Sequence, residues 1–329
     1  MHELFSALIA ALVTGFGLRL MLGSGLAGLA QDHANDRSMH VGAVPRIGGM
    51  GIAIGVMAAL LLAGPSAWPE AIRPLAAAVA LVFAVSLIDD LRGLSALPRL
   101  LAHLVCAAGL CWCWDLPAVW IPVATLGIAW GANLYNFMDG ADGLAGAMAV
   151  FGYGALGVAA WAADAPAIGA ICAAVTGAAL GFLTLNWHPA RVFLGDAGSV
   201  PLGFGAAALA LHGTLAGLWP AALPAIAFLP FITDASLTLL RRALRGARLS
   251  EPHREHLYQR LALAGHGHRW VAMRACMLMF ASGLAALSTL YVSPAAQWAV
   301  FAAALFAHVG GWLALDRSLR ARENQSTRR

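Results

Sequence analysis

The sequence predicts an all-α protein that crosses a membrane many times. Of its 329 residues, 60% are hydrophobic and only 11% are charged, and the mean hydropathy is +0.76. Such a chain has too little polar surface to form a soluble globule of this length. Apolar runs long enough to cross about 30 Å of hydrocarbon as helices also recur along the whole chain.

Eleven apolar runs are predicted as membrane-spanning helices. They cover residues 4–28, 47–64, 71–88, 100–114, 117–135, 145–162, 166–185, 199–213, 218–240, 270–291 and 296–315. The number becomes ten if the fourth run does not cross or the last two are divided differently. The longest polar interval, 241–269, is too short to build a core of its own. We therefore expect one membrane domain over residues 1–329, with a short basic tail at 316–329.

The basic residues predict the orientation of the chain. All 20 are arginine, and a chain with its N-terminus outside has nearly all of its loop arginines on the inner side. Of the loop arginines, only Arg73 is then plainly outside. Arginines beside anionic headgroups account for the net charge of +4, so no nucleic acid is needed as a partner.

Polar clusters interrupt the apolar runs at regular intervals. An even number of predicted spans separates each cluster from the next, so all of them return to the inner face of the membrane. They are the first inner loop, QDHANDRSMHVGAVPRIGG (31–49), then LIDDLRG (87–93), NLYNFMDGADGLAG (133–146), NWHPARVFLGDAGS (186–199) and RRALRGARLSEPHREHLYQRL (241–261). This boundary is where we expect the chemistry.

The acidic clusters each have a structural and a functional interpretation. Asp89 and Asp90 either end the third helix at headgroup level or surround a cation, since adjacent carboxylates repel and are easier to keep ionised around Mg²⁺. The Asp-Gly pairs at Asp139 and Asp142 are either loop turns or part of a site. The LGDAGS stretch could be a turn into the eighth helix, with Ser199 near its N-cap.

The last polar cluster, residues 241–261, also has a structural and a functional interpretation. His253 and His256 would share one helical face, as a solvated surface pair or as a phosphate-binding or acid–base pair. The arginines from 241 to 248 are interpreted as anchors at the membrane surface. Asp234 lies inside an apolar run, where a carboxylate needs partners. Separate structural explanations must hold at all five places, whereas a single site explains them together.

In combination these motifs resemble the polyprenyl-phosphate N-acetylhexosamine-1-phosphate transferases, glycosyltransferase family 4, which includes the MraY and WecA types. The resemblance covers about residues 30–265, in the same order and at similar spacing. It is carried by NDRSMHVGAVPRIGG, LIDDLRG, NLYNFMDGADGLAG, VFLGDAGSVPLGF, PFITDASLTLLRR and PHREHLYQRL.

The resemblance implies an enzyme of the bacterial inner membrane with its active site facing the cytoplasm. It would transfer a sugar 1-phosphate from a UDP-N-acetylhexosamine to undecaprenyl phosphate and release UMP. Phosphoryl transfer depends on positioning and charge neutralisation, which implies Mg²⁺, with Mn²⁺ as an alternative. Membrane lipids are the other expected partners. A homodimer is possible, but nothing in the residues indicates one.

Site residues carry over from the family by their positions in the motifs. Asp196 matches the metal-binding aspartate, and Asp89 and Asp90 match the acidic pair, of which one lies near the acceptor phosphate and one, assigned to Asp90, near the metal. His256 matches the first histidine of the last motif and completes the expected catalytic set. The expected substrate-binding residues are Arg46, Asn133, Asn136, Asp139, Asp142, Phe193, His253 and Arg254. Among these, Phe193 would stack on uracil, and Arg46 and Arg254 would contact phosphates.

The last motif departs from the commoner family form. Many members have a His-x-His-His run there, whereas this chain has His256-Leu257-Tyr258-Gln259, preceded by His253 where an aspartate is common. The HREHLYQ form is similar to the branch that begins O-antigen or related chains from UDP-N-acetylfucosamine, UDP-N-acetylquinovosamine or UDP-N-acetylglucosamine. The peptidoglycan enzyme, phospho-MurNAc-pentapeptide transferase, remains an alternative.

Two other classes of protein are weighed against the transferase. A transporter of polyprenyl lipids would keep ionisable residues along a path at the midplane, whereas here they lie at the ends of the spans. A structural membrane protein would tolerate asparagine at Asp90 and Asp196.

Overall fold

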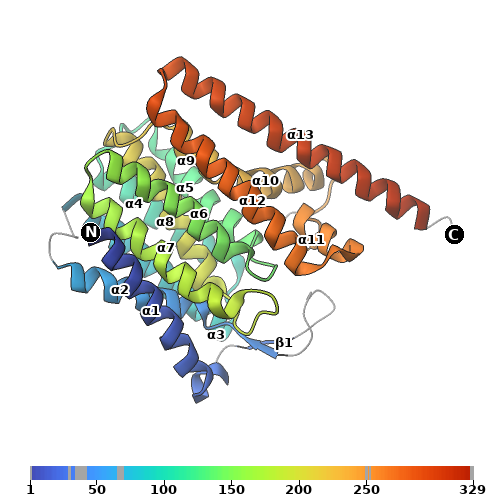
Figure 1. Cartoon of the computed structure of the whole chain (residues 1–329), viewed down its shortest axis with the longest axis horizontal. Helices are drawn as coiled ribbons and strands as arrows, with labels where there is room; N and C mark the ends of the chain where they lie inside the picture. Colours follow the sequence, from blue (N-terminus) through green and yellow to red (C-terminus); the bar gives the residue numbers. More distant parts are fainter. Residues whose placement is uncertain are drawn as a thin grey trace.

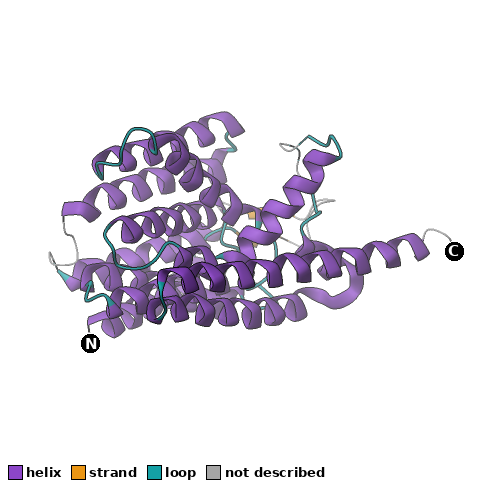
Figure 2. Cartoon of the chain, turned by 90° about the horizontal axis from the view of Figure 1, so that it is seen from above, coloured by secondary structure: helices purple, strands orange, loops and turns teal. Residues whose placement is uncertain are grey.

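The computed structural model describes residues 2–28, 31–33, 43–64, 70–248, 251 and 253–326. Nearly all of these residues are helical (Figure 2), and the chain is an all-α, multi-pass membrane protein, as predicted. Two short strands, β1 (Gln31–His33) and β2 (Ala43–Pro45), form an antiparallel pair in which Gln31 faces Pro45. Residues 34–42 of the first inner loop lie outside the described part of the chain.

The helices follow the order of the predicted apolar runs (Figure 1). They are α1 (His2–Leu22), α2 (Gly48–Ala63), α3 (Arg73–Arg92), α4 (Ala96–Cys113), α5 (Ile121–Phe137), α6 (Leu144–Ala162), α7 (Pro166–Asn186), α8 (Asp196–Leu215), α9 (Ala222–Ala227), α10 (Leu229–Leu244), α11 (Leu257–Leu261), α12 (Gly267–Ser288) and α13 (Pro294–Ser326). Short helical turns η1 (Gly25–Gly28), η3 (Glu70–Ile72), η4 (Ala262–His266) and η5 (Thr289–Tyr291) join them.

The ninth run, 218–240, is not one helix. It forms α9 and α10, which break at Phe228, because Pro230 lacks the N–H that would continue the helical ladder through this point. Seven helical segments of the described chain are long and apolar enough to cross a membrane, α4 among them, and α2 is a shorter apolar helix. The number eleven therefore stays a prediction, while the positions of the runs match the helices.

Glycine allows the helices at the centre of the bundle to approach closely. A Cβ on Gly49 of α2 would lie 2.3 Å from the backbone nitrogen of Gly198 on α8, which no side chain could occupy. A Cβ on Gly177 of α7 would lie 2.0 Å from the carbonyl oxygen of Ala7 on α1. Small residues at such crossings replace the hydrophobic driving force that lipid does not supply. The first of these crossings places the start of α8 against the start of α2.

The last helix, α13, runs along the outside of the bundle (Figures 1 and 2) and packs on α9, α10, α11 and α12. It does not end with the predicted span 296–315 but continues to Ser326, through most of the predicted tail at 316–329. In Figure 1, α11 and β1 lie on the side of the bundle toward which the C-terminal end of α13 points.

Candidate active site

Two of the predicted acidic residues meet at a single arginine. Asp89 lies in the last turn of α3, and Asp196 is the first residue of α8. Arg99, near the start of α4, donates from the same Nη1 atom to Asp89 Oδ2 and, at 2.8 Å, to Asp196 Oδ2. Asp89 Oδ1 also accepts the backbone N–H of Leu94 at 2.5 Å, which holds the short turn between α3 and α4. Two carboxylates from distant segments thus converge on one cation.

Asp90 has a different task from Asp89. Its two carboxylate oxygens accept the backbone N–H groups of Asp196, at 3.1 Å, and Ala197, at 2.8 Å. The first N–H groups of a helix have no acceptor within the helix, and its N-terminus carries a partial positive charge. A carboxylate is therefore favourable at the start of α8. Metal binding by Asp90 and Asp196 stays a prediction. In the structure, Asp89 is the side chain that shares Arg99 with Asp196, and Asp90 positions the backbone that carries Asp196.

Asp196 lies before the predicted span 199–213 in an electrostatically strained position. Burial raises its pKa to about 7, and the hydrogen bond with Asp89 and the negative charges of Asp90 and Asp89 act in the same direction, while Arg99 opposes them. A carboxylate in this state gains most from an additional cation. The Asp89–Asp90–Asp196–Arg99 group is called the aspartate centre below.

The first inner loop reaches the aspartate centre through its backbone. Phe193 donates its N–H to the Pro45 carbonyl at 2.8 Å, and the N–H of Gly48 donates to the Phe193 carbonyl at 2.9 Å. This pairing places Arg46 beside Gly195 and Asp90: a Cβ on Gly195 would lie 3.3 Å from Arg46 Cβ and 2.7 Å from Asp90 Oδ2. Gly195 has φ of 72°, so glycine is required both for the backbone and for the space. Arg46 is thus at the site, as predicted; stacking of Phe193 on uracil stays a prediction.

The end of α5 meets the start of α8 at Asn136. Ser199 Oγ lies 2.9 Å from Asn136 Oδ1 and 3.0 Å from the Gly195 carbonyl oxygen, so its O–H can donate to either. Ser199 is therefore inside α8 and not near its N-cap, which is Gly195. Asn133, one turn earlier, donates to the Ala129 carbonyl of its own helix at 2.7 Å. Of the two asparagines, Asn136 is the one joined to the segment that carries Asp196.

Asp142 binds three segments together. His188 Nδ1 lies 2.7 Å from Asp142 Oδ2, which also accepts the N–H of Ala190 at 3.1 Å. His268 Nδ1 lies 3.3 Å from the Asp142 backbone nitrogen and 3.5 Å from Oδ1. Burial acts to raise the pKa of Asp142, but the hydrogen bonds with His268, His188 and Ala190 outweigh it and hold the pKa below its usual range. This carboxylate fixes the loops of the site relative to one another.

The predicted histidines lie against the end of α5. The rings of His253 and His256 are 4.9 Å apart, and the His256 ring stacks on Phe137 at 6.1 Å. Tyr258 donates its O–H to the Phe137 carbonyl at 3.1 Å, and it interacts electrostatically with Asp139. Burial lowers the pKa of His253 to about 4, and the positive charges of His256 and Arg242 add to this effect. Burial also lowers the pKa of His256, so both rings are neutral at pH 7.

Asp234 is a structural carboxylate. It is buried, and Oδ1 accepts the N–H of Leu257 at 2.8 Å, Thr238 Oγ1 at 3.1 Å and Trp312 Nε1 at 3.2 Å. Its Oδ2 accepts the N–H of Tyr258 at 3.1 Å. The cost of burying this group inside an apolar run is offset by four donors, which hold α11 in place. Its position in the sequence correctly predicted that it has partners.

Three residues of the site were not predicted: Arg99, His188 and His268. Arg99 was interpreted only as a marker of orientation, although the turn of three residues between α3 and α4 brings it back beside Asp89. His188 and His268 lie 80 residues apart in the sequence and meet only around Asp142, where their rings stack at 5.8 Å. Arg254 lines a pocket together with arginines of α10 and α13, and its contact with a substrate phosphate stays a prediction.

Carboxylates at the aspartate centre suit a divalent cation. No group of three or more His, Cys, Asp or Glu side chains in the described chain is arranged to hold a metal by itself. Mg²⁺, however, needs only one or two carboxylates when phosphate oxygens and water complete its shell. Asp89 and Asp196 already converge on the Nη1 of Arg99, so this pair fits such an ion.

An apolar pocket of about 290 Å³ begins beside the aspartate centre. Gly49, Ala197 and Gly198 belong to its lining, directly after Asp196, and the pocket continues between α2, α3 and α8. Most of the remaining lining consists of aliphatic side chains, such as Ile52 and Leu202. Charge and apolar surface therefore meet at the first turn of α8.

Comparison with known proteins finds a matching family and several similar enzymes. Residues 72–214 match the family described as "Glycosyl transferase family 4". The chain is 29% identical to the "Probable undecaprenyl-phosphate N-acetylglucosaminyl 1-phosphate transferase" of Bacillus subtilis, over 78% of this chain and 76% of the relative. It is 29% identical to the "Decaprenyl-phosphate N-acetylglucosaminephosphotransferase" of Mycobacterium leprae, over 96% of this chain and 90% of the relative.

A shorter similarity points to another member of the same group. The "Phospho-N-acetylmuramoyl-pentapeptide-transferase" of Geobacillus thermodenitrificans is 41% identical over 30% of this chain and 31% of its own length. The matched segment 72–214 contains the whole aspartate centre, and the longer alignments extend the similarity over most of the chain. Residues 72–214 thus match glycosyl transferase family 4, and most of the chain is similar to transferases that act on polyprenyl phosphates.

Proposed function

We propose that this protein transfers an N-acetylhexosamine 1-phosphate from a UDP-sugar to undecaprenyl phosphate and releases UMP. The reaction would take place at the cytoplasmic face of a bacterial inner membrane. There, the acceptor lies in the bilayer and the donor arrives from solution. Relatives over most of the chain have names that describe transfer of a sugar phosphate to a polyprenyl phosphate, which supports the general reaction.

One observation carries the proposal: the first turn of α8 belongs at once to the aspartate centre and to the apolar pocket. A phosphate on a long apolar chain needs polar and cationic groups at its head and aliphatic surface along its tail. Arg46 and Arg99 lie beside Asp90 and Asp196, and the pocket starts at Ala197. The acceptor phosphate can thus lie at the arginines with its chain between α2, α3 and α8.

The carboxylates would serve through position and charge. Asp89 and Asp196 would hold Mg²⁺ or Mn²⁺, which would neutralise the negative charge that builds up on the transferred phosphoryl group. Asp90 holds the start of α8, and so keeps Asp196 at a fixed distance from Asp89. The acceptor phosphate is largely ionised at pH 7, since the second pKa of a simple phosphate ester is about 6, so it needs little help from a base.

The donor would lie between the end of α5 and the histidine loop. Asn136, Asp139, Phe193 and His256 come from the segments that adjoin there. Neutral His253 and His256 can donate hydrogen bonds to a sugar or a phosphate without adding charge. The form of the last motif favours a donor used to begin O-antigen or a related polysaccharide. A MurNAc-pentapeptide donor is the second candidate, because of the local similarity to peptidoglycan enzymes.

The test is UMP release by the purified protein with undecaprenyl phosphate and a panel of UDP-N-acetylhexosamines, including UDP-MurNAc-pentapeptide. We expect release with Mg²⁺ and none with EDTA, and the preferred donor identifies the pathway. Asp196→Asn should lower the rate by at least about 10²-fold, as loss of a key electrostatic group does. Asp164→Asn is the matched control, because Asp164 is exposed and its φ of 52° suits asparagine.

Two outcomes would contradict the proposal. Folded protein that releases no UMP with any donor would exclude this transfer and favour a transporter of polyprenyl lipids. Full activity in Asp196→Asn would mean that the aspartate centre is not the reaction site.

A further inference from the structure

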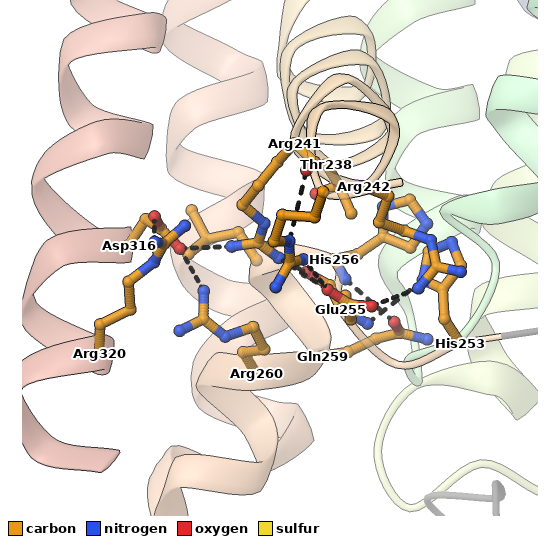
Figure 3. Close-up of polar contacts among 12 residues, drawn as sticks. Thr238, Arg241, Arg242, His253, Glu255, His256, Gln259, Arg260, Asp316 and Arg320 are labelled. Carbon is orange, nitrogen blue, oxygen red and sulfur yellow. Dashed lines mark hydrogen bonds and ion pairs between the residues drawn. The ribbon is translucent and has the colours of Figure 1, made fainter. Parts of the chain in front are cut away.

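A second pocket, of about 700 Å³, lies between α10, the segment from His253 to His266, and the C-terminal part of α13. Six arginines line it: Arg241, Arg245, Arg254, Arg260, Arg320 and Arg322. They come from three segments far apart in the sequence, and Figure 3 shows several of them converging on Asp316 and Glu255. We call this the arginine pocket.

In the described part of the chain, the lining of the arginine pocket contains six arginines and one acidic residue, Glu255. Asp316 accepts bonds from Arg241 at 2.5 Å, from Arg320 at 2.9 Å and from Arg260, and Glu255 binds Arg242 and Arg245 (Figure 3). Six guanidinium groups line the pocket, and Asp316 and Glu255 are the carboxylates seen to bind them among the described residues. Cations held this close together repel one another, so a bound anion would relieve an energetic cost.

Hydrogen-bonding capacity is also left over at this place. The Nε–H group of Arg241, which lines the pocket, is buried and has no hydrogen-bond partner among the described residues. A buried donor without a partner costs free energy, so it points to a ligand that supplies acceptors. Phosphate oxygens are suitable, because arginine presents several N–H groups in a planar fork that matches them.

Apolar side chains in the lining of the arginine pocket favour a lipid phosphate over a soluble phosphate as its ligand. Leu263, Ala264 and Leu319 belong to the lining, and Leu263 is 56% exposed. The pocket also has the right depth: Arg320 and Arg322 lie one to two turns beyond the predicted span 296–315, where headgroups are expected. A free phosphate or a nucleotide would make no use of exposed leucine, whereas a phosphate that carries acyl chains would.

The arginine pocket is separate from the aspartate centre. The helix that supplies Arg320 and Arg322, α13, packs on α9, α10, α11 and α12, while the aspartate centre is built from α3, α4 and α8. None of Asp89, Asp90, Asp196 and Arg99 lines the arginine pocket. An anion bound here therefore lies outside the aspartate centre.

We propose that the arginine pocket binds the phosphate headgroup of an anionic phospholipid of the surrounding membrane, as a ligand and not as a substrate. The bound headgroup joins α13 to α10 and to the segment that carries His253 and His256. The proposal does not depend on the reaction that the aspartate centre performs.

The test compares lipids that differ only in headgroup charge. The full-length protein in a neutral detergent is titrated with phosphatidylglycerol or with phosphatidylcholine of the same acyl chains, and bound lipid is counted by native mass spectrometry. We expect phosphatidylglycerol to bind at least about tenfold more tightly, and Arg320→Gln or Arg322→Gln to weaken it by about five- to tenfold each. Arg317→Gln is the matched control: it removes one exposed arginine of α13 that does not line the pocket.

Each contrary result overturns the proposal in a distinct way. Equal binding of the two lipids, or equal effects of Arg322→Gln and Arg317→Gln, would mean that no headgroup site exists here. Millimolar inorganic phosphate that displaces phosphatidylglycerol completely would assign the pocket to a soluble phosphate. Displacement by a UDP-sugar would assign it to the donor. Arg320 and Arg322 are both exposed, so these variants should remain folded, and an unchanged melting temperature without lipid checks this.

Discussion

The starts of α8 and α11 resemble each other and differ in one decisive respect. Each is capped by an aspartate from another helix, Asp90 for α8 and Asp234 for α11, whose two oxygens accept two successive backbone N–H groups. Asp234 also accepts hydrogen bonds from Thr238 and Trp312, so four donors surround it. At α8 the capped helix presents another carboxylate, Asp196, which shares Arg99 with Asp89.

This difference between the two helix starts assigns a structural role to Asp234 and a functional role to Asp196. The four donors around Asp234 occupy its carboxylate oxygens and hold α11 in place, so this carboxylate is not available to a ligand. The aspartate centre has three carboxylates and one bridging arginine. Its excess negative charge favours the binding of a cation. The sequence motifs matched Asp196 to a metal-binding aspartate and marked Asp234 only as a carboxylate that needs partners. The number of donors around each gives the physical reason for this difference.

The largest expected effect is that of Asp89→Asn on the reaction. This change removes one of the two carboxylates that share Arg99, while the amide oxygen can still accept the N–H of Leu94. We expect the rate of UMP release to fall by about 10²- to 10³-fold with little change in melting temperature. Asp115→Asn, at an exposed residue with φ of 51°, is the control. A variant that keeps more than half of the wild-type rate would remove Asp89 from the reaction.

Asp234→Asn should act mainly on stability. An amide has one acceptor oxygen, so donors now bound to Asp234 would face an N–H₂ group inside the protein. We expect the free energy of unfolding to fall by about 2–4 kcal/mol and the melting temperature by several degrees. Activity per folded molecule should fall far less than in Asp89→Asn. The reverse order of effects would mean that Asp234 belongs to the reaction site and that the comparison of the two helix starts is wrong.

Asp90→Asn should give a smaller loss of both kinds. One N–H of α8 keeps its acceptor and the other loses it, which corresponds to about 1–2 kcal/mol of stability. Because Asp90 positions Asp196, we expect the rate to fall by about tenfold, less than for Asp89→Asn. Thermal melting and UMP release on the same preparation measure the two effects. A rate as low as that of Asp89→Asn would instead indicate that Asp90 binds the metal, as its place in the sequence motif suggested.

The smallest effect concerns pH. His253 has a folded pKa of about 4 against an ordinary value of 6.5, because of burial and of the positive charges of His256, Arg242 and Arg241, opposed by Glu255. The unfolded chain therefore binds more protons between these values, and stability is lost as the pH falls from about 6.5 toward 4. His253→Gln should reduce the loss of melting temperature between pH 7 and pH 5. His266→Gln, which removes a histidine outside this group, should leave the loss as in the wild type.

The sequence by itself determined the helical, membrane-spanning architecture and the acidic residues of the site. Helix formation in lipid is a local requirement, since every backbone group must find its partner within the segment. Apolar runs therefore locate the long helices. The break at Phe228, the end of α1 at Leu22 and the extension of α13 to Ser326 depart from the predicted runs. The motifs around Asp89, Asp139 and Asp196 depend on residue type and spacing, and both are visible in the sequence.

Only the tertiary structure decided which polar groups meet. Arg99 joins Asp89 to Asp196 across 97 residues, and Asp142 draws His188 and His268 together. Arg254 lies with Arg320, which comes from a segment that the sequence suggested was a tail. Two adjacent residues also have different partners, because Asp89 binds Arg99 whereas Asp90 caps α8. These contacts depend on how helices cross and on which side chain faces which neighbour, and neither follows from periodicity along a single run.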